Sequence, residues 1–293
     1  MILSPENIKV KSSVLILHGM KEHCGRYLAF AKYLSNQGIA VLIYDHIGHG
    51  NSVKSKDELG FFKKNDSVAK LLNDATRMSE ILKSAYPDVP HFILGHSMGS
   101  FITRNLLREQ SNRFDGAIIV GTGGKVFGIS MAQFLFKILN AIAPKYKSKF
   151  INASFDVINN RRFAKEKPSD GTNWLSVNME NRKNFIQDPL CGVDFSFNGF
   201  YTLFSLVNLA TKKNWAENMA KNYPFLFISG NQDPIGNFGK GVLQTANDLK
   251  NDGFGNVSLN LYENMRHEIL NEDIKEEVYQ DILDWLNLHS IEN

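Results

Sequence analysis

The sequence predicts an α/β protein in which a mostly parallel sheet is flanked by helices, with a mainly helical cap inserted. Short apolar runs alternate with amphipathic stretches from residue 13 to 121, and again from 224 to 289. Strands that alternate with helices of this length form parallel sheets with helices on both faces. The alternation lapses between, so we expect a core of residues 1–124 and 203–293 and an inserted cap over 125–202.

Each expected element follows from its own pattern of apolar residues and turn residues. Gly38 closes the first helix, and Pro87 follows the second. Apolar runs of five to seven residues that end at glycine or polar turns are typical of buried strands. The expected strands are 13–18, 39–45, 91–95, 116–121, 224–230 and 257–263, and the expected helices are 26–37, 68–85, 97–110, 239–251 and 274–289.

Composition limits the classes of function that the chain can have. A net charge of +3 is too small to indicate a nucleic-acid partner, and the chain has no basic-aromatic motif of RNA-binding proteins. Two cysteines, Cys24 and Cys191, are too few for a disulfide framework. Residues 1–13 lack the basic start and apolar run of a signal peptide. We therefore expect a cytoplasmic protein.

The sequence Gly95-His96-Ser97-Met98-Gly99 stands between an expected strand and an expected helix. In this context it predicts a sharp turn that exposes the serine hydroxyl and admits only small residues two positions away on either side. The N–H of Met98, at the start of the helix, then favours negative charge beside Ser97. A second N–H, that of Met20, follows the first strand, and two such donors make an oxyanion hole.

An acid and a base follow the last two strands of the expected sheet. Asp233 comes after the fifth strand and His267 after the sixth, which gives the chain order Ser, Asp, His. His267 would take the proton of Ser97, and Asp233 would orient the imidazole. Taken singly, Asp233 is also a common turn residue before proline, and His267 an ordinary loop histidine. The histidine pairs 18/23 and 46/49 lack further ligands at zinc-like spacing, so we expect neither a metal nor a cofactor.

The chain resembles the monoacylglycerol lipase and lysophospholipase branch of the serine α/β-hydrolases, in the form of its bacterial members. The resemblance rests on residues 18–27, 44–52, 95–99, 233–241 and 266–268. It implies the α/β-hydrolase fold, a triad of Ser97, Asp233 and His267, and an oxyanion hole from the N–H groups of Met20 and Met98. The family usually begins with an antiparallel hairpin, and the dozen residues before the first strand here would complete one strand at most.

Two features remain open between a structural and a functional interpretation. Glu22 and Arg26, four residues apart, either hold the loop of Met20 or form an ordinary helix-surface pair. Residues 126–143 read as a helix with a narrow polar stripe at Ser130, Gln133, Lys137 and Asn140, so it has more apolar surface than one contact needs. That surface either lines an acyl tunnel and meets lipid, or is simply buried within the cap.

The cap is expected to set substrate preference. It is rich in aromatic residues, and we expect substrate binding by Phe127, Phe134, Trp174 and Phe200. Residues 125–202 hold eleven Lys and Arg against six Asp and Glu. Lys145, Lys147 and Lys149 directly follow the apolar helix and predict peripheral contact with an anionic membrane, unless they form only a solvated positive face.

These observations predict a serine carboxylic-ester hydrolase that cleaves single-chain lipid esters, such as monoacylglycerols or lysophospholipids, through an acyl-enzyme on Ser97. One alternative is an aminopeptidase of the proline-iminopeptidase kind, which would need acidic groups for a free amino terminus. Another is a silent binding protein on the same fold, which would usually lack a triad member. Oligomeric state stays open.

Overall fold

The computed structural model describes residues 1–6 and 8–290, and its centre is one sheet of seven strands in the order β1-β3-β2-β4-β5-β6-β7. Every strand pair is parallel except that of β1 with β3. Each of the six predicted strands is present to within about two residues. The strands are β1 (Ile2–Leu3), β2 (Ser12–Leu17), β3 (Ile39–Ile43), β4 (His91–His96), β5 (Gly116–Val120), β6 (Phe225–Gly230) and β7 (Val257–Tyr262).

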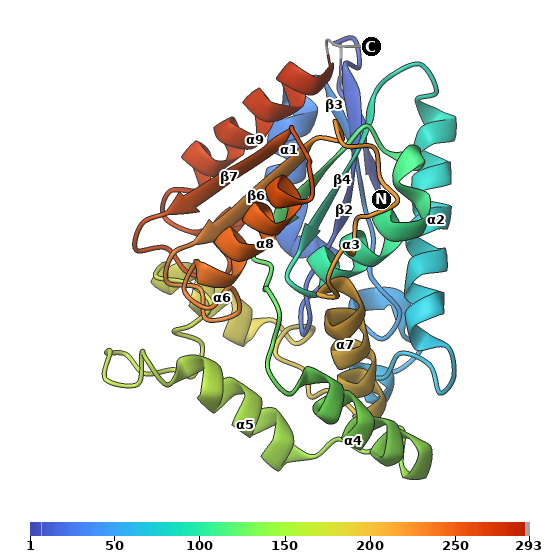
Figure 1. Ribbon diagram of the computed structural model, residues 1–293. Coiled ribbons are helices and arrows are strands. Elements are labelled where there is room, and N and C mark those ends of the chain that lie inside the picture. The colour runs from blue at the N-terminus through green and yellow to red at the C-terminus, as the bar shows by residue number, and fades with distance from the viewer. Residues whose placement is uncertain (7, 291–293) are drawn as a thin grey trace.

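Five helices cover the two faces of this sheet, as the alternating pattern predicts. One face packs against α1 (Leu28–Asn36) and α9 (Lys275–Ser290), and the other against α2 (Ser67–Ala85), α3 (Met98–Gln110) and α8 (Lys240–Asn251) (Figure 1). Strands β2 to β6 are buried along their whole length, which explains their nearly unbroken apolar sequences. The β1 strand adds two antiparallel residues at the edge, in keeping with the short stretch before β2.

The register of the central strands decides which loops meet at the carboxyl edge of the sheet. Leu17 of β2 pairs with Gly95 of β4, and His96 pairs with Val120 of β5. The segments that follow these strands therefore begin at the same level. This places the loop after β2 beside the turn that carries Ser97.

Four helices between β5 and β6 lie across the carboxyl ends of the strands (Figure 1). They are α4 (Ile129–Ile142), α5 (Lys149–Asn160), α6 (Met179–Gln187) and α7 (Phe197–Ala210). The expected boundary between residues 202 and 203 falls inside α7, which is one continuous helix. Its second half joins the core, because Asn105 of α3 donates to the Leu206 carbonyl at 2.9 Å. The division into core and cap therefore stays a prediction.

Gln133 and Asn140 of the polar stripe of α4 face the protein, Ser130 and Lys137 are exposed, and most of the apolar side chains of the helix face outward. Gln133 donates to Ser205 at 3.0 Å and accepts from Asn208 at 2.6 Å, both on α7, while Asn198 donates to Asn140 at 3.0 Å. Phe136 is the one buried large side chain of the helix and packs among aromatic residues of α7. The expectation of spare apolar surface is therefore correct, and the alternative of a fully buried helix is wrong. None of the helices within residues 1–6 and 8–290 has the length and apolar content needed to cross a membrane.

Candidate active site

Ser97 occupies a strained turn between β4 and α3. Its φ of 53° and ψ of −117° lie outside the regions that most residues with a side chain adopt. A β-carbon on Gly95 would lie 2.3 Å from the Gly99 carbonyl oxygen, and one on Gly99 would lie 2.1 Å from that of Leu17. These distances confirm that the turn requires glycine at both positions.

Asp233 and His267 form a buried pair at the ends of β6 and β7. The Nδ1 atom of His267 lies 2.9 Å from Oδ2 of Asp233, and the Asp233 side chain is fully buried. Asp233 also accepts from the N–H of Ile235 at 2.8 Å and from the Ser229 hydroxyl at 3.3 Å. Because the carboxylate accepts the Nδ1–H, the proton-accepting nitrogen of the neutral ring is Nε2. The plain interpretations, a turn aspartate and a surface histidine, do not fit this geometry.

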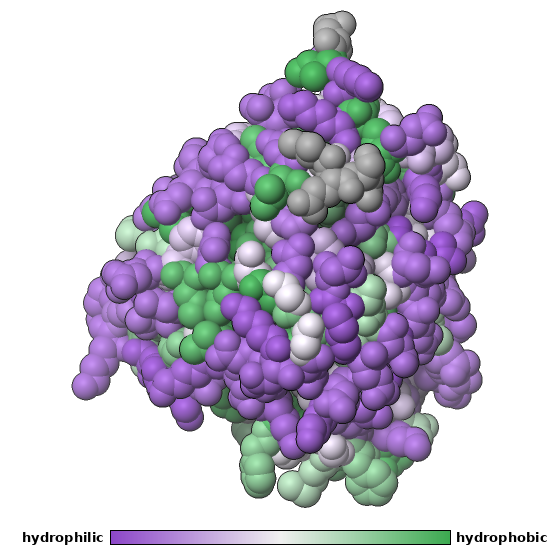
Figure 2. Space-filling view, turned by 45° about the horizontal axis from the view of Figure 1, so that its top comes forward, coloured by the Kyte–Doolittle hydropathy of each residue, from purple (hydrophilic) through white to green (hydrophobic). Residues whose placement is uncertain are grey.

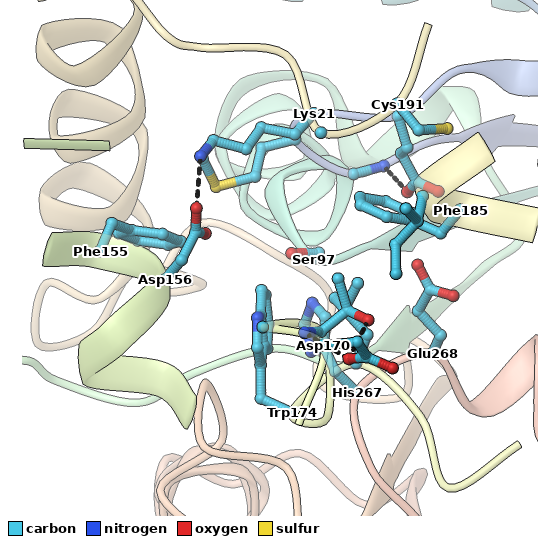
Figure 3. Close-up of a pocket in the computed structure, with 18 of the residues that line it drawn as sticks. Lys21, Ser97, Phe155, Asp156, Asp170, Trp174, Phe185, Cys191, His267 and Glu268 are labelled. Carbon is cyan, nitrogen blue, oxygen red and sulfur yellow. Dashed lines mark hydrogen bonds and ion pairs between the residues drawn. The ribbon is translucent and has the colours of Figure 1, made fainter. Parts of the chain in front are cut away.

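Ser97 and His267 line one cavity of about 350 Å³ (Figure 3). The structure records no hydrogen bond between these two side chains, and such bonds are often long in the absence of substrate. Trp174 of the cap stacks beside the imidazole, with ring centroids 5.1 Å apart. On the other side, Nε2 of His96 donates to the His267 carbonyl at 3.1 Å and holds the backbone of its loop.

The two proposed oxyanion donors belong to segments that adjoin Ser97. Met98 is the first residue of α3, where a helix leaves its N–H groups without acceptors, and Met20 lines the cavity. The loop of Met20 is held by Glu22, whose Oε1 accepts from the Gly19 N–H at 2.5 Å and from the Tyr27 hydroxyl at 2.7 Å. Glu22 therefore fixes the loop rather than forming only a helix-surface pair.

Positively charged neighbours balance the negative charge of the buried Glu22 carboxylate. Burial alone would raise the pKa of Glu22, but the hydrogen bond and positive charge of His96 and the nearby Arg26 hold it well below its usual range. Nε of Arg26 lies 3.3 Å from Oε2 of Glu22, and the Arg26 guanidinium also pairs with Glu268. The pKa of His96 is raised in return, because Glu22 and Glu268 outweigh its burial. Residues 22, 26, 96 and 268 therefore form one charged network beneath the cavity.

Three further buried histidines, His18, His46 and His49, pack together as a cluster of rings. The ring centroids of His18 lie 4.2 Å from those of His46 and 5.2 Å from those of His49. Both nitrogens of His18 are engaged, because Nδ1 meets the Gly19 carbonyl at 2.8 Å and Nε2 accepts from the His46 N–H at 3.0 Å. Burial lowers the pKa of His46 to about 3 and that of His49 to about 4. This cluster shapes the loops, in keeping with the sequence-based interpretation.

A different set of residues places three metal-binding atom types close together. The ligand-type atoms of His23, Asp188 and Cys191 lie within 4.8 Å of one another. Nδ1 of His23 accepts from the Gly25 N–H at 3.2 Å, so Nε2 carries the proton that it donates to Asp188 at 2.8 Å. With this tautomer neither ring nitrogen has a free lone pair for a metal. We read the set as a link between the loop after β2 and the cap.

The four aromatic residues expected to bind substrate lie in different places. Trp174 lines the cavity with Phe155 and Phe185. Phe127 and Phe134 are exposed on and before α4, and Phe200 is buried in the core, so none of these three lines the cavity. The expectation that they contact substrate is not met by this arrangement, because α4 turns its apolar side outward and α7 packs inward.

Sequence reasoning missed the polar end of the cavity. Lys21 in the loop after β2 pairs with Asp156 of α5 at 3.4 Å (Figure 3). Asp170, which also lines the cavity, pairs with Arg182 at 3.0 Å. Asn181 of α6 donates to Glu268 at 2.7 Å. Only the position of Glu268, directly after His267, gave a sequence signal, because the cap partners are 12 to 135 residues from the groups they meet in the chain.

Comparison with known proteins gives a consistent family. The family model described as "Serine aminopeptidase, S33" (Hydrolase_4) matches residues 8–274. A monoglyceride lipase homolog of Monkeypox virus is 29% identical over 281 residues, which cover 94% of this chain and 89% of that protein. The rat monoglyceride lipase is 24% identical over 94% of this chain and 82% of its own length.

Solved structures agree with this family. A thermostable carboxyl esterase from Bacillus coagulans, in complex with glycerol, superposes with a TM-score of 0.91 and 27% identity. The match covers 99% of this chain and 93% of that structure. The seven-stranded sheet, the serine turn and the inserted helices are those of an α/β-hydrolase. The chain belongs to the Hydrolase_4 family and is an α/β-hydrolase of the monoacylglycerol lipase and lysophospholipase type.

Proposed function

We propose that this protein hydrolyses single-chain lipid esters, monoacylglycerols first among them, through an acyl-enzyme on Ser97. The observation that carries the proposal is a cavity in which Ser97 and His267 lie among both aromatic and charged side chains (Figure 3). Phe155, Trp174 and Phe185 form the apolar part, and Lys21 and Asp156 belong to the polar part. A lipid with one acyl chain and a small hydroxylated head group likewise combines an apolar part with a polar part.

The proposed reaction uses each group in a position that suits it. His267 Nε2 takes the Ser97 proton as the hydroxyl attacks the ester carbonyl, and Asp233 stabilises the imidazolium at Nδ1. The N–H groups of Met20 and Met98 stabilise the oxyanion. His267 then donates its proton to the leaving alcohol, and a water molecule hydrolyses the acyl-enzyme by the same steps in reverse.

The aminopeptidase alternative is less well supported by the carboxylates of the cavity. An ammonium group on a peptide would need a free carboxylate, but those lining the cavity already have partners. Asp156 pairs with Lys21, Asp170 with Arg182, and both Glu22 and Glu268 with Arg26. The pairs of Arg26 with Glu22 and Glu268 are buried on both sides, and breaking such a buried pair costs about 3–5 kcal/mol, which binding of the peptide ammonium group would have to offset.

The proposal extends to contact between the outer face of the cap and a membrane. Hydrophobic side chains project at the lower edge of Figure 2, where α4 and α5 lie in Figure 1. This apolar cap face consists of Phe127, Met131, Phe134, Leu135, Ile138, Ile142, Phe150, Val157 and Ile158, all of them exposed. An exposed patch of this kind, next to basic residues, suits insertion between lipid head groups. We place the enzyme at an anionic cytoplasmic leaflet, which both free cysteines suit.

Two of the three lysines beside this face also contact the core. Nζ of Lys147 donates to the Asp57 carbonyl at 3.0 Å, and Nζ of Lys145 lies 5.3 Å from the centre of the Phe61 ring. Because these two lysines are partly engaged within the protein, the proposed membrane docking depends more on the apolar side chains than on the lysine charges. Phe127 and Phe134 act in this proposal as membrane contacts rather than as walls of the substrate cavity.

A substrate panel tests the enzymatic proposal. Purified protein is assayed with monodecanoylglycerol, decanoyl-lysophosphatidylcholine, p-nitrophenyl esters and aminoacyl anilides, and Ser97→Ala serves as the control. We expect turnover of the lipid esters and none of the anilides. Preferential cleavage of the anilides would replace the proposal with the aminopeptidase alternative.

Vesicle co-sedimentation tests membrane contact separately. Wild type is compared with Phe127→Ser/Phe134→Ser, with Lys145→Gln/Lys147→Gln/Lys149→Gln, and with a control double change of exposed apolar residues elsewhere, Ile81→Ser/Leu243→Ser. We expect the phenylalanine variant to lose most binding, and the lysine variant to lose the part that depends on anionic lipid and low salt. Equal binding by all four proteins would refute the docking face and leave the esterase proposal intact.

A further inference from the structure

A second cavity of about 380 Å³ lies apart from the active site and shares none of its lining residues. It lies between α3, the end of α7 and α8. Four of its lining residues carry positive charge: Arg104, Lys125, Lys212 and Lys213. Asp248 and Asp252 are the acidic residues of the lining, so the cavity holds two positive charges in excess.

Arg104 is the unusual member of this group. It is only 1% exposed, yet its guanidinium forms no ion pair within the described part of the chain. Its Nη1 donates to the Gly123 carbonyl at 2.9 Å and weakly to the Thr122 hydroxyl at 3.4 Å. Nε is buried without a partner, and the structure gives none for Nη2. Buried charges in proteins are ordinarily paired, and arginine does not escape the cost by losing its proton.

The surroundings hold this guanidinium ready for a ligand. Its Cζ atom lies over the ring of Trp215, 4.8 Å from the ring centre. The negative charge of Asp248 favours the charged form of Arg104, although the two side chains are too far apart for an ion pair. Lys125, Lys212 and Lys213 are exposed at the rim. An oxyanion in the cavity would give Nη2 of Arg104 the charged partner that the protein does not supply.

We propose that this cavity binds a phosphate group. A phosphate monoester carries close to two negative charges at neutral pH, which matches the excess positive charge of the lining. Because Nη1 of Arg104 already donates to the Gly123 carbonyl and Nε is sealed from solvent, Nη2 is the group left to donate to a phosphate oxygen. Lys125, Lys212 and Lys213 line a neighbouring hollow as well, together with the apolar residues Val126, Phe127 and Ile129. A phosphate with an attached alkyl chain can therefore lay that chain toward the start of α4.

Binding to inorganic phosphate is the direct test, measured by calorimetry and by thermal shift, with sodium chloride keeping the ionic strength constant. We expect saturable binding to wild type. Arg104→Met should weaken it by about tenfold or more, because a hydrogen bond between charged groups is lost. Lys212→Gln/Lys213→Gln should weaken it several-fold, whereas the exposed control pair Lys63→Gln/Lys64→Gln should leave it unchanged.

Asp248→Asn separates a binding role of the cavity from a structural one. Removing this carboxylate should strengthen phosphate binding several-fold, since it lessens the repulsion, although it removes charge that favours Arg104 in the free protein. If Arg104→Met does not fold, the lysine pair and Asp248→Asn still decide the question. Absence of saturable binding, or equal losses in the control pair, would overturn the proposal.

A further arm distinguishes the source of the phosphate. Dodecyl phosphate, which has no carboxylic ester for Ser97 to attack, is compared with inorganic phosphate below its micelle concentration. Binding at least tenfold tighter for dodecyl phosphate, lost in part on Val126→Ser, would indicate a lipid phosphate. Equal affinity for the two would indicate a free phosphate or a soluble phosphate ester. Both results require that binding weakens in Lys212→Gln/Lys213→Gln and not in the Lys63→Gln/Lys64→Gln control, without which the cavity is not the site.

Discussion

Replacing Glu22 by glutamine should reduce turnover and stability together, and the structure gives the size of both effects. The Glu22 carboxylate accepts from the Gly19 N–H at 2.5 Å and from the Tyr27 hydroxyl at 2.7 Å, and it pairs with Arg26 and His96. Glutamine preserves the shape and one acceptor oxygen but removes the charge. Since breaking a buried ion pair costs about 3–5 kcal/mol, we expect a loss of about 3 kcal/mol in the free energy of unfolding.

The effect of Glu22→Gln on kcat follows from the loop that carries Met20. Removing an oxyanion donor outright lowers kcat by about 10²–10³-fold. Glu22→Gln displaces this donor without deleting it, so we expect kcat to fall by about 10- to 100-fold. KM should change by less than about threefold, because the apolar wall that holds the acyl chain is untouched.

A stability control keeps this prediction falsifiable. Leu286 of α9 is fully buried on the face of the sheet away from α3, and Leu286→Ala should cost about 2–5 kcal/mol. Steady-state kinetics and urea unfolding are measured for both variants at a temperature where each is folded. An unchanged kcat in Glu22→Gln, or an equal fall in Leu286→Ala, would show that Glu22 does not position the oxyanion loop.

Three further predictions concern the triad, the buried histidines and the acyl wall. Asp233→Asn should lower kcat by about 10⁴-fold, because the asparagine amide favours the wrong tautomer of His267. A much smaller loss in steady-state assays with long incubation would contradict this role of Asp233. Lowering the pH from 7.5 to 5.5 should reduce the free energy of unfolding by about 3 kcal/mol through His46 and His49. Burial holds their pKa values below the usual 6.5, so the unfolded chain takes up protons that the folded chain does not. The lowered pKa of His18 adds to this loss of stability, and the raised pKa of His96 offsets part of it. Urea titrations that show equal stability at both pH values would refute the prediction. Finally, kcat/KM for p-nitrophenyl esters should rise by up to about fourfold for each methylene from acetate onward until the wall is covered, and a flat series would contradict an acyl-binding cavity.

The sheet was largely predictable from the sequence, because a fully buried strand leaves a local apolar pattern. The fully buried β4 and the glycines on either side of Ser97 illustrate this: both patterns arise from contacts within a few residues or one strand pair. The edge strand β1 was not predicted as an element, since two residues carry no periodic signal. The chain order of Ser97, Asp233 and His267 was visible because each follows a strand.

The cap was less predictable, because its contacts join residues far apart in the chain. Trp174 reaches His267, and Lys21 reaches Asp156 across 135 residues, without any local pattern. The orientation of α4 could not be derived from its own sequence either. A narrow polar stripe usually faces water, but here the side chains of α7 supply hydrogen-bond partners, so Gln133 and Asn140 of the stripe face inward. This inversion moved Phe134 from the expected substrate wall to the outer face.

The most direct test of the account is covalent labelling with a p-nitrophenyl alkylphosphonate, which mimics the tetrahedral intermediate and stays on the nucleophile. Intact-protein mass spectrometry and peptide mapping follow the label while hydrolysis of monodecanoylglycerol is measured on the same samples. The account predicts one phosphonyl group per chain, located on Ser97, with activity lost in proportion, and no labelling of Ser97→Ala. A label on another residue, or full hydrolysis after Ser97 is labelled, would contradict it.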